Sequence, residues 1–113
     1  NVGETLRKAM TFNPYLKVFI ANGYYDLGTP YFATEYTFDH LGLAEDVRRN
    51  ISMEYYEAGH MMYIHEPSIK KLRRDLEEFY DELAAGAAQQ WTARFNPRPL
   101  DEANFREIYE SAL

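Results

Sequence analysis

The stretch YLKVFIANGYYD, residues 15–26, determines how the rest of the chain is interpreted. Residues 15–21 form a compact apolar run with β-branched and aromatic side chains, and Asn22 and Gly23 follow it. A run of this kind is typical of a strand that is buried on both faces of a parallel sheet. The junction after the strand carries one carboxylate, Asp26. The stretch therefore predicts a parallel sheet with an acid just beyond the carboxyl end of a strand.

The next segments predict a crossover unit. Thr29 can cap a helix that has Pro30 at its first position and runs to about His40. Residues 50–58, NISMEYYEA, then return as a second strand, and His60 follows shortly after it. A strand, a helix and a strand over about 45 residues form a parallel crossover. The predicted fold class is therefore α/β.

Helices are predicted on both sides of this unit. Residues 3–12 form a short helix that stops at Asn13-Pro14. Apolar residues after Pro67 recur at steps of three and four and define one helical face. These residues are Ile69, Leu72, Leu76, Phe79 and Leu83.

The sequence pattern changes after Leu83. The segment AAGAAQQW is compatible with a helix, NPRP at 96–99 interrupts it, and Asp101 can cap a further helix. We therefore divide the chain into residues 1–83, which hold the crossover unit, and residues 84–113, a helical extension of unknown origin. A helical tail of this kind needs an apolar surface to cover, on its own chain or on a partner.

Composition narrows the function classes. The formal net charge is −6 and no basic stripe with interleaved aromatic residues is present, which argues against a nucleic acid or an anionic membrane as partner. Cysteine is absent, so the chain has no disulfide, no thiolate metal site and no cysteine nucleophile. No apolar run approaches the roughly 18 residues of a membrane-spanning helix. Because the sequence begins with Asn1 and not Met, we expect it to be a piece of a longer protein.

The two residues that matter for chemistry follow the two strands. In an open parallel sheet the carboxyl ends of the strands form the ligand crevice, and Asp26 and His60 come directly after those ends. A carboxylate beside an imidazole can orient the ring so that its other nitrogen acts as a general base. The pair would be two members of a catalytic triad, but Ser52, Ser68 and Ser111 all lie downstream of Asp26 and outside a nucleophile elbow. A nucleophile is therefore expected outside this chain, or the pair has no catalytic role.

The motifs Gly23-Tyr-Tyr-Asp26 and Ala58-Gly-His-Met61, with the sequence around them, resemble the C-terminal end of bacterial serine carboxypeptidases, a branch of the α/β-hydrolase fold. The resemblance covers about residues 5–80. It implies that residues 1–83 are the C-terminal segment of an α/β-hydrolase, with two parallel strands, a crossover helix and flanking helices. The helical tail after Leu83 matches nothing in the family. The resemblance also implies that Asp26 is the triad acid, that His60 is the triad base and that Met61 lines the pocket for the departing C-terminal residue.

The same resemblance implies the partners and the location. The substrate is a peptide, the upstream part of the hydrolase domain covers the sheet, and no metal or organic cofactor is needed. Independently of the resemblance, a parallel strand pair without its neighbours would expose apolar surface, so the chain is also expected to associate with a second copy of itself. A secreted or periplasmic location is favoured by the family alone. The nucleophilic serine, the oxyanion donors and the groups that bind the terminal carboxylate would belong to regions absent from this chain, which by itself is expected to be inactive.

Other interpretations remain open. An esterase or lipase of the same fold would use the same Asp26 and His60. A protein of a different class, a non-catalytic interaction module, would use the exposed crevice and the tail helices to bind a partner or another copy. His65 with His60, Glu57 and Glu66 fits no compact metal-ligand spacing.

Overall fold

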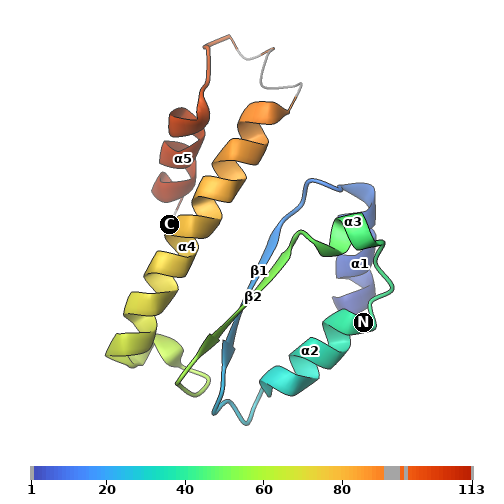
Figure 1. Ribbon diagram of the computed structural model, residues 1–113, viewed down its shortest axis with the longest axis vertical. Coiled ribbons are helices and arrows are strands. Elements are labelled where there is room, and N and C mark those ends of the chain that lie inside the picture. The colour runs from blue at the N-terminus through green and yellow to red at the C-terminus, as the bar shows by residue number, and fades with distance from the viewer. Residues whose placement is uncertain (1, 91–94, 96, 113) are drawn as a thin grey trace. The chain divides into compact units, whose positions relative to one another are not determined.

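The computed structural model describes residues 2–90, 95 and 97–112 of the chain. This part is a mixed α/β structure, so the predicted α/β class is confirmed (Figure 1). It divides into two compact units, Asn1–Leu72 and Arg73–Leu113. The elements in chain order are α1 (Val2–Phe12), β1 (Val18–Gly23), α2 (Tyr31–Asp39), α3 (Glu45–Arg48), β2 (Ile51–Tyr56), the short 3-10 helix η1 (Met62–Ile64), α4 (Glu66–Gln89) and α5 (Glu102–Ser111).

The sheet of the first unit consists of β1 and β2, which pair in parallel from Val18 opposite Ile51 to Gly23 opposite Tyr56. Helices α1, α2 and α3 all lie to one side of these strands (Figure 1). The predicted parallel crossover is therefore confirmed. The strand bounds differ from the prediction, because β1 begins at Val18 and includes Asn22 and Gly23, which we had placed after the strand.

The strands are only half-buried, so the expectation of a strand buried on both faces is wrong for the described part of the chain. Ala21 is exposed, and most other strand residues are of intermediate exposure. Within the described part of the chain few apolar residues are buried, and the sheet has only two strands, each with one unpaired edge. The buried apolar residues are Met10, Val47, Tyr56, Ala58, Met62 and Ala84.

The small core of the first unit lies at the end of β2. Tyr56, Ala58 and Met62 form one buried cluster, and Leu72 of α4 packs against it. Lys71 of α4 also contacts β2. Its Nζ donates to Glu54 Oε2 at 2.6 Å and lies 4.6 Å from the centre of the Tyr56 ring, where a cation is attracted to the ring face. The core therefore supports the loop after β2, which carries His60.

The crossover helix α2 starts differently from the prediction. Its N-cap is Pro30 and no side chain caps it, so the prediction of Thr29 as the cap is wrong. The helix ends as expected near His40, whose Nδ1 lies 2.7 Å from the carbonyl oxygen of Tyr36, and Gly42 follows with φ of 66°. Two elements were not predicted, α3 and η1, because four and three residues are too few to show a periodic pattern.

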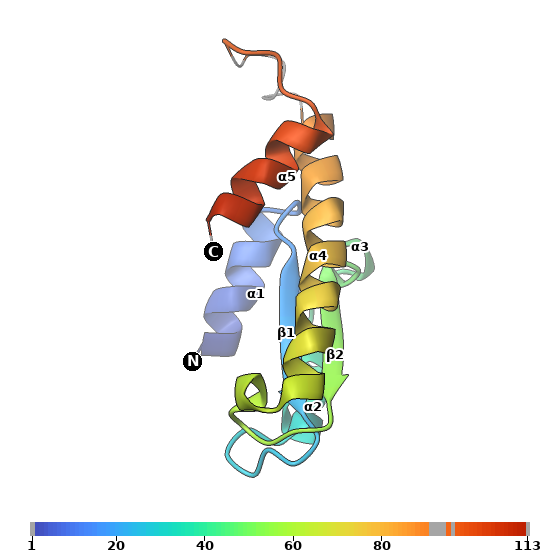
Figure 2. The same ribbon diagram turned by 90° about the vertical axis from the view of Figure 1, so that its left-hand side faces the viewer.

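The second unit pairs the C-terminal part of α4 with α5, which lie side by side in Figures 1 and 2. An ion pair between Arg106 and Asp81 joins the two helices. Asp101 caps α5 in a capping box with Asn104, as the sequence predicted. Helix α4 continues without a break through Leu83 to Gln89. The NPRP segment lies partly outside the described residues.

Within the described residues, we find no helix with both the length and the apolar character needed to cross a lipid bilayer.

Candidate active site

Asp26 and His60 are brought together by the parallel pairing of the two strands. Asp26 lies three residues after the end of β1, and His60 lies four residues after the end of β2. Although they are 34 residues apart in the sequence, His60 Nδ1 lies 2.7 Å from Asp26 Oδ2. The sequence-based expectation that these side chains meet is therefore confirmed.

Backbone contacts hold the two loops together beyond the sheet. The N–H of Tyr24 donates to the carbonyl of Tyr56 at 2.9 Å, and the N–H of Tyr25 donates to the carbonyl of Ala58 at 3.0 Å. Gly23 makes this approach possible, because a Cβ there would lie 2.6 Å from the oxygen of Ala58 and 2.7 Å from the oxygen of Gly59. Only glycine fits at this position without a shift of the backbone.

The Asp26 carboxylate is buried and saturated with donors. Its side chain is 5% exposed. Oδ1 accepts from the backbone N–H of Gly28 at 2.8 Å and of Thr29 at 2.9 Å, and Oδ2 accepts from the hydroxyl of Thr29 at 2.6 Å. The hydrogen bonds from Thr29, followed by the one from His60, lower the pKa of Asp26 well below its usual range, against the opposing effect of burial. The carboxylate is therefore ionised at neutral pH.

The ionised carboxylate determines the tautomer of His60. An ionised carboxylate can only accept hydrogen bonds, so Nδ1 of His60 carries the proton that points to Asp26 Oδ2. In the neutral ring this leaves the lone pair on Nε2. The imidazole is 72% exposed. A fixed ring with an accessible basic nitrogen is the geometry of a general base.

The serines of the chain do not complete a triad within the described residues. Ser68 lies near the start of α4 and is buried, and its Oγ is 2.7 Å from Nδ1 of His65. Ser111 donates to the carbonyl of Ile108, and Ser52 lies within β2. None of these contacts joins a serine to His60.

Met61 directly follows His60 and is 49% exposed. It is the N-cap residue of η1. Its role in lining a substrate pocket stays a prediction.

The residue that the sequence analysis misread is Thr29. We predicted it to cap α2, but its backbone and its hydroxyl both donate to Asp26. A signal for this role is present in the sequence, because aspartate side chains commonly accept hydrogen bonds from backbone groups two and three residues later. Gly28 and Thr29 occupy those two positions.

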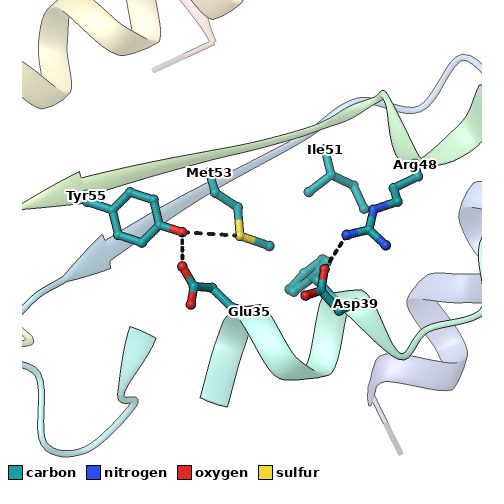
Figure 3. A pocket seen from close by; sticks show the side chains of 7 residues that line it. Glu35, Asp39, Arg48, Ile51, Met53 and Tyr55 are labelled. Carbon is teal, nitrogen blue, oxygen red and sulfur yellow. Dashed lines mark hydrogen bonds and ion pairs between the residues drawn. The ribbon is translucent and has the colours of Figure 1, made fainter. Parts of the chain in front are cut away.

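A separate cleft of about 330 Å³ lies between α2 and β2 (Figure 3). Neither Asp26 nor His60 lines it. Its lining residues are Glu35, Phe38, Asp39, Arg48, Ile51, Met53 and Tyr55. Its polar groups bond to one another: Tyr55 donates to Glu35 Oε1 at 2.5 Å, and Arg48 pairs with Asp39.

Tyr55 also belongs to a cluster of tyrosines next to this cleft. Its ring stacks on Tyr24 with centroids 5.5 Å apart, and Tyr31 meets both rings edge to face. Tyr56 is a core residue at 1% exposure, whereas Tyr25 is 68% exposed.

The hydroxyl of Tyr55 is expected to lose its proton at a higher pH than an ordinary tyrosine. Its hydrogen bond to Glu35, together with burial and the charge of Glu35, raises the pKa of Tyr55 to about 12. The native state therefore keeps this proton between pH 10 and 12, where an unfolded tyrosine loses it. The contribution of Tyr55 to the free energy of unfolding is full below about pH 10 and falls as the pH rises to about 12.

The test is an alkaline absorbance titration of the phenolate band, with the Tyr55→Phe curve subtracted from that of the wild type. The difference should titrate near pH 12, and in a Glu35→Gln background it should move back toward pH 10. A difference curve centred near pH 10 in the wild type would contradict the Tyr55–Glu35 hydrogen bond.

Within the described residues, no group of three or more histidine or acidic side chains is arranged to hold a metal ion. Comparisons of the chain with protein-family models, with curated proteins and with solved structures found no match.

Proposed function

We propose that this protein is a serine-type carboxypeptidase of the α/β-hydrolase fold, and that residues 1–113 supply the acid and the base of its catalytic triad. The observation that carries the proposal is the bond of 2.7 Å between Asp26 Oδ2 and His60 Nδ1, beyond the carboxyl ends of two adjacent parallel strands. The resemblance of the two surrounding motifs to serine carboxypeptidases supplies the reaction class.

The mechanism assigns one task to each side chain. Nε2 of His60 takes the proton of the attacking serine hydroxyl and later passes it to the leaving amine. Asp26 keeps Nδ1 protonated, orients the ring and stabilises the imidazolium that forms. Serine attack on the scissile carbonyl produces an acyl-enzyme and releases the C-terminal residue, and water then hydrolyses the acyl-enzyme.

The nucleophilic serine comes from a part of the protein outside residues 1–113. Two observations on the described residues support additional protein against this unit. Each strand has one unpaired edge, which is a template for another strand. Asn22 at the end of β1 is 5% exposed, and its Nδ2 has no hydrogen-bond partner among the described residues. Buried amides normally have a partner, and a neighbouring segment would provide one.

The test is hydrolysis of an N-blocked dipeptide by the full-length protein. We expect release of the free C-terminal amino acid, faster than hydrolysis of a short acyl ester under the same conditions. Ester hydrolysis without peptide hydrolysis would identify an esterase that uses the same two residues. Residues 1–113 alone are expected to hydrolyse neither compound, because no serine among their described residues contacts His60.

A further inference from the structure

Thr29 contacts both oxygens of the Asp26 carboxylate. Its backbone N–H donates to Oδ1 at 2.9 Å, and its hydroxyl donates to Oδ2 at 2.6 Å. Oδ1 receives a second bond from the backbone of Gly28. The backbone donors bind only Oδ1 of the carboxylate. The hydroxyl of Thr29 binds Oδ2, which is the oxygen that contacts His60.

The hydroxyl and the imidazole converge on the same oxygen. Oδ2 accepts from Thr29 Oγ1 at 2.6 Å and from His60 Nδ1 at 2.7 Å, and the two donor atoms are 3.4 Å apart. The terminal torsion of an aspartate is broad, so a carboxylate held at one oxygen can rotate the other away. A donor on Oδ2 restricts that rotation. The same hydroxyl bond is the largest cause of the lowered pKa of Asp26.

We propose that Thr29 is a positioning residue for the candidate triad: its hydroxyl holds Oδ2 of Asp26 in the orientation that binds Nδ1–H of His60. The inference rests on the proposed function for its effect on turnover, but the effect on the Asp26–His60 contact is independent of any activity. The hydroxyl does not cap α2, whose N-cap is Pro30 without a side-chain bond. Its described hydrogen bonds are thus directed to the candidate site.

The experiment uses the full-length protein in three variants. Thr29→Val removes the hydroxyl and keeps the shape of the side chain, and Thr29→Ser restores the hydroxyl. Thr37→Val is the matched control, because the Thr37 hydroxyl donates at 2.8 Å to the carbonyl of Ala33 within α2, away from Asp26. The first measurement is the nuclear magnetic resonance spectrum of histidine-labelled protein, in which the Nδ1–H proton of His60 bonded to a carboxylate resonates far downfield. The second measurement is kcat and KM for the blocked dipeptide.

We expect Thr29→Val to lose or broaden the downfield His60 resonance and to lower kcat about tenfold with an unchanged KM, because small misplacements of catalytic groups are costly. Thr29→Ser and Thr37→Val should behave like the wild type in both measurements. A Thr29→Val protein that keeps the wild-type resonance would overturn the proposal, and if it also melts at a lower temperature, the role of Thr29 is only to stabilise its turn.

The two proposals fail in different ways. If the wild type shows the downfield resonance but releases no amino acid, the proposed function fails, and the comparison of resonances between Thr29→Val and Thr29→Ser still decides the role of Thr29. If the wild type releases the amino acid and Thr29→Val has an unchanged kcat and resonance, the positioning role fails and the proposed function stands.

Discussion

Replacing Asp26 with asparagine in the full-length protein is expected to lower kcat for the blocked dipeptide by about 10⁴-fold, as the loss of a triad acid does in serine peptidases. The backbone N–H groups of Gly28 and Thr29 would bind the amide oxygen of the new side chain, because Oδ1 accepts from both in the wild type. The amide nitrogen would then face His60. Because an amide nitrogen can only donate, the ring would carry its proton on Nε2, the nitrogen that accepts the serine proton in the proposed mechanism.

The matched control for this variant is Asp39→Asn. Asp39 is exposed in α2 and pairs with Arg48, and it does not contact the candidate triad. An exposed ion pair of this kind contributes about 0–1 kcal/mol to the free energy of unfolding, so its loss should leave the protein folded. Because Asp39 does not contact the candidate triad, kcat should stay within about twofold of the wild type. Equal kcat values for Asp26→Asn and Asp39→Asn would remove Asp26 from the mechanism.

Replacing Gly23 with alanine is expected to disable the site although neither Asp26 nor His60 is changed. The added Cβ would lie 2.6 Å from the oxygen of Ala58 and 2.7 Å from that of Gly59, and both are backbone atoms that cannot rotate away. The loop that carries His60 must therefore move from Asp26. We expect a loss of about 1–3 kcal/mol in the free energy of unfolding, as for other overpacked sites. A decrease in kcat of about 100-fold should accompany it, since the base is misplaced.

Gly86→Ala serves as the comparison for this variant. Gly86 lies inside α4, and a Cβ there meets no atom within 4 Å apart from the adjacent residues and backbone of its own helix. Alanine should stabilise the helix by about 0.5–1 kcal/mol and leave kcat unchanged. Chemical denaturation and the dipeptide assay measure both quantities on the same samples. If Gly23→Ala unfolds and turns over like the wild type, the close contact of the two loops does not hold the site together.

The parallel crossover was predictable because its two strands carry strong local signals. The apolar run before Asn22 and the β-rich segment before Gly59 indicated strands, and Pro30 indicated the start of the helix between them. Once the strands were parallel and adjacent, the residues after their carboxyl ends had to lie at one edge of the sheet. That is why Asp26 and His60 could be paired from the sequence.

The details of the site were less predictable, since they depend on contacts between loops. Threonine is a residue type that commonly caps helices. Only the fold shows that the hydroxyl of Thr29 donates to the Asp26 carboxylate and does not cap α2. The end of β1 was misplaced for a related reason. Asn22 and Gly23 are typical turn residues, but their register with Tyr55 and Tyr56 keeps them in the strand. The half-buried strand faces depend on what covers the sheet, which a local pattern does not encode.

The most direct test of the central claim is labelling of the full-length protein with a serine-directed phosphonate, followed by mass spectrometric mapping of the modified residue in the wild type and in His60→Ala. We expect rapid labelling of one serine outside residues 1–113 in the wild type and a loss of that labelling in His60→Ala, because His60 activates the nucleophile in the proposed mechanism. Labelling at the same rate in both proteins, or modification of Ser52, Ser68 or Ser111 in residues 1–113 alone, would contradict it.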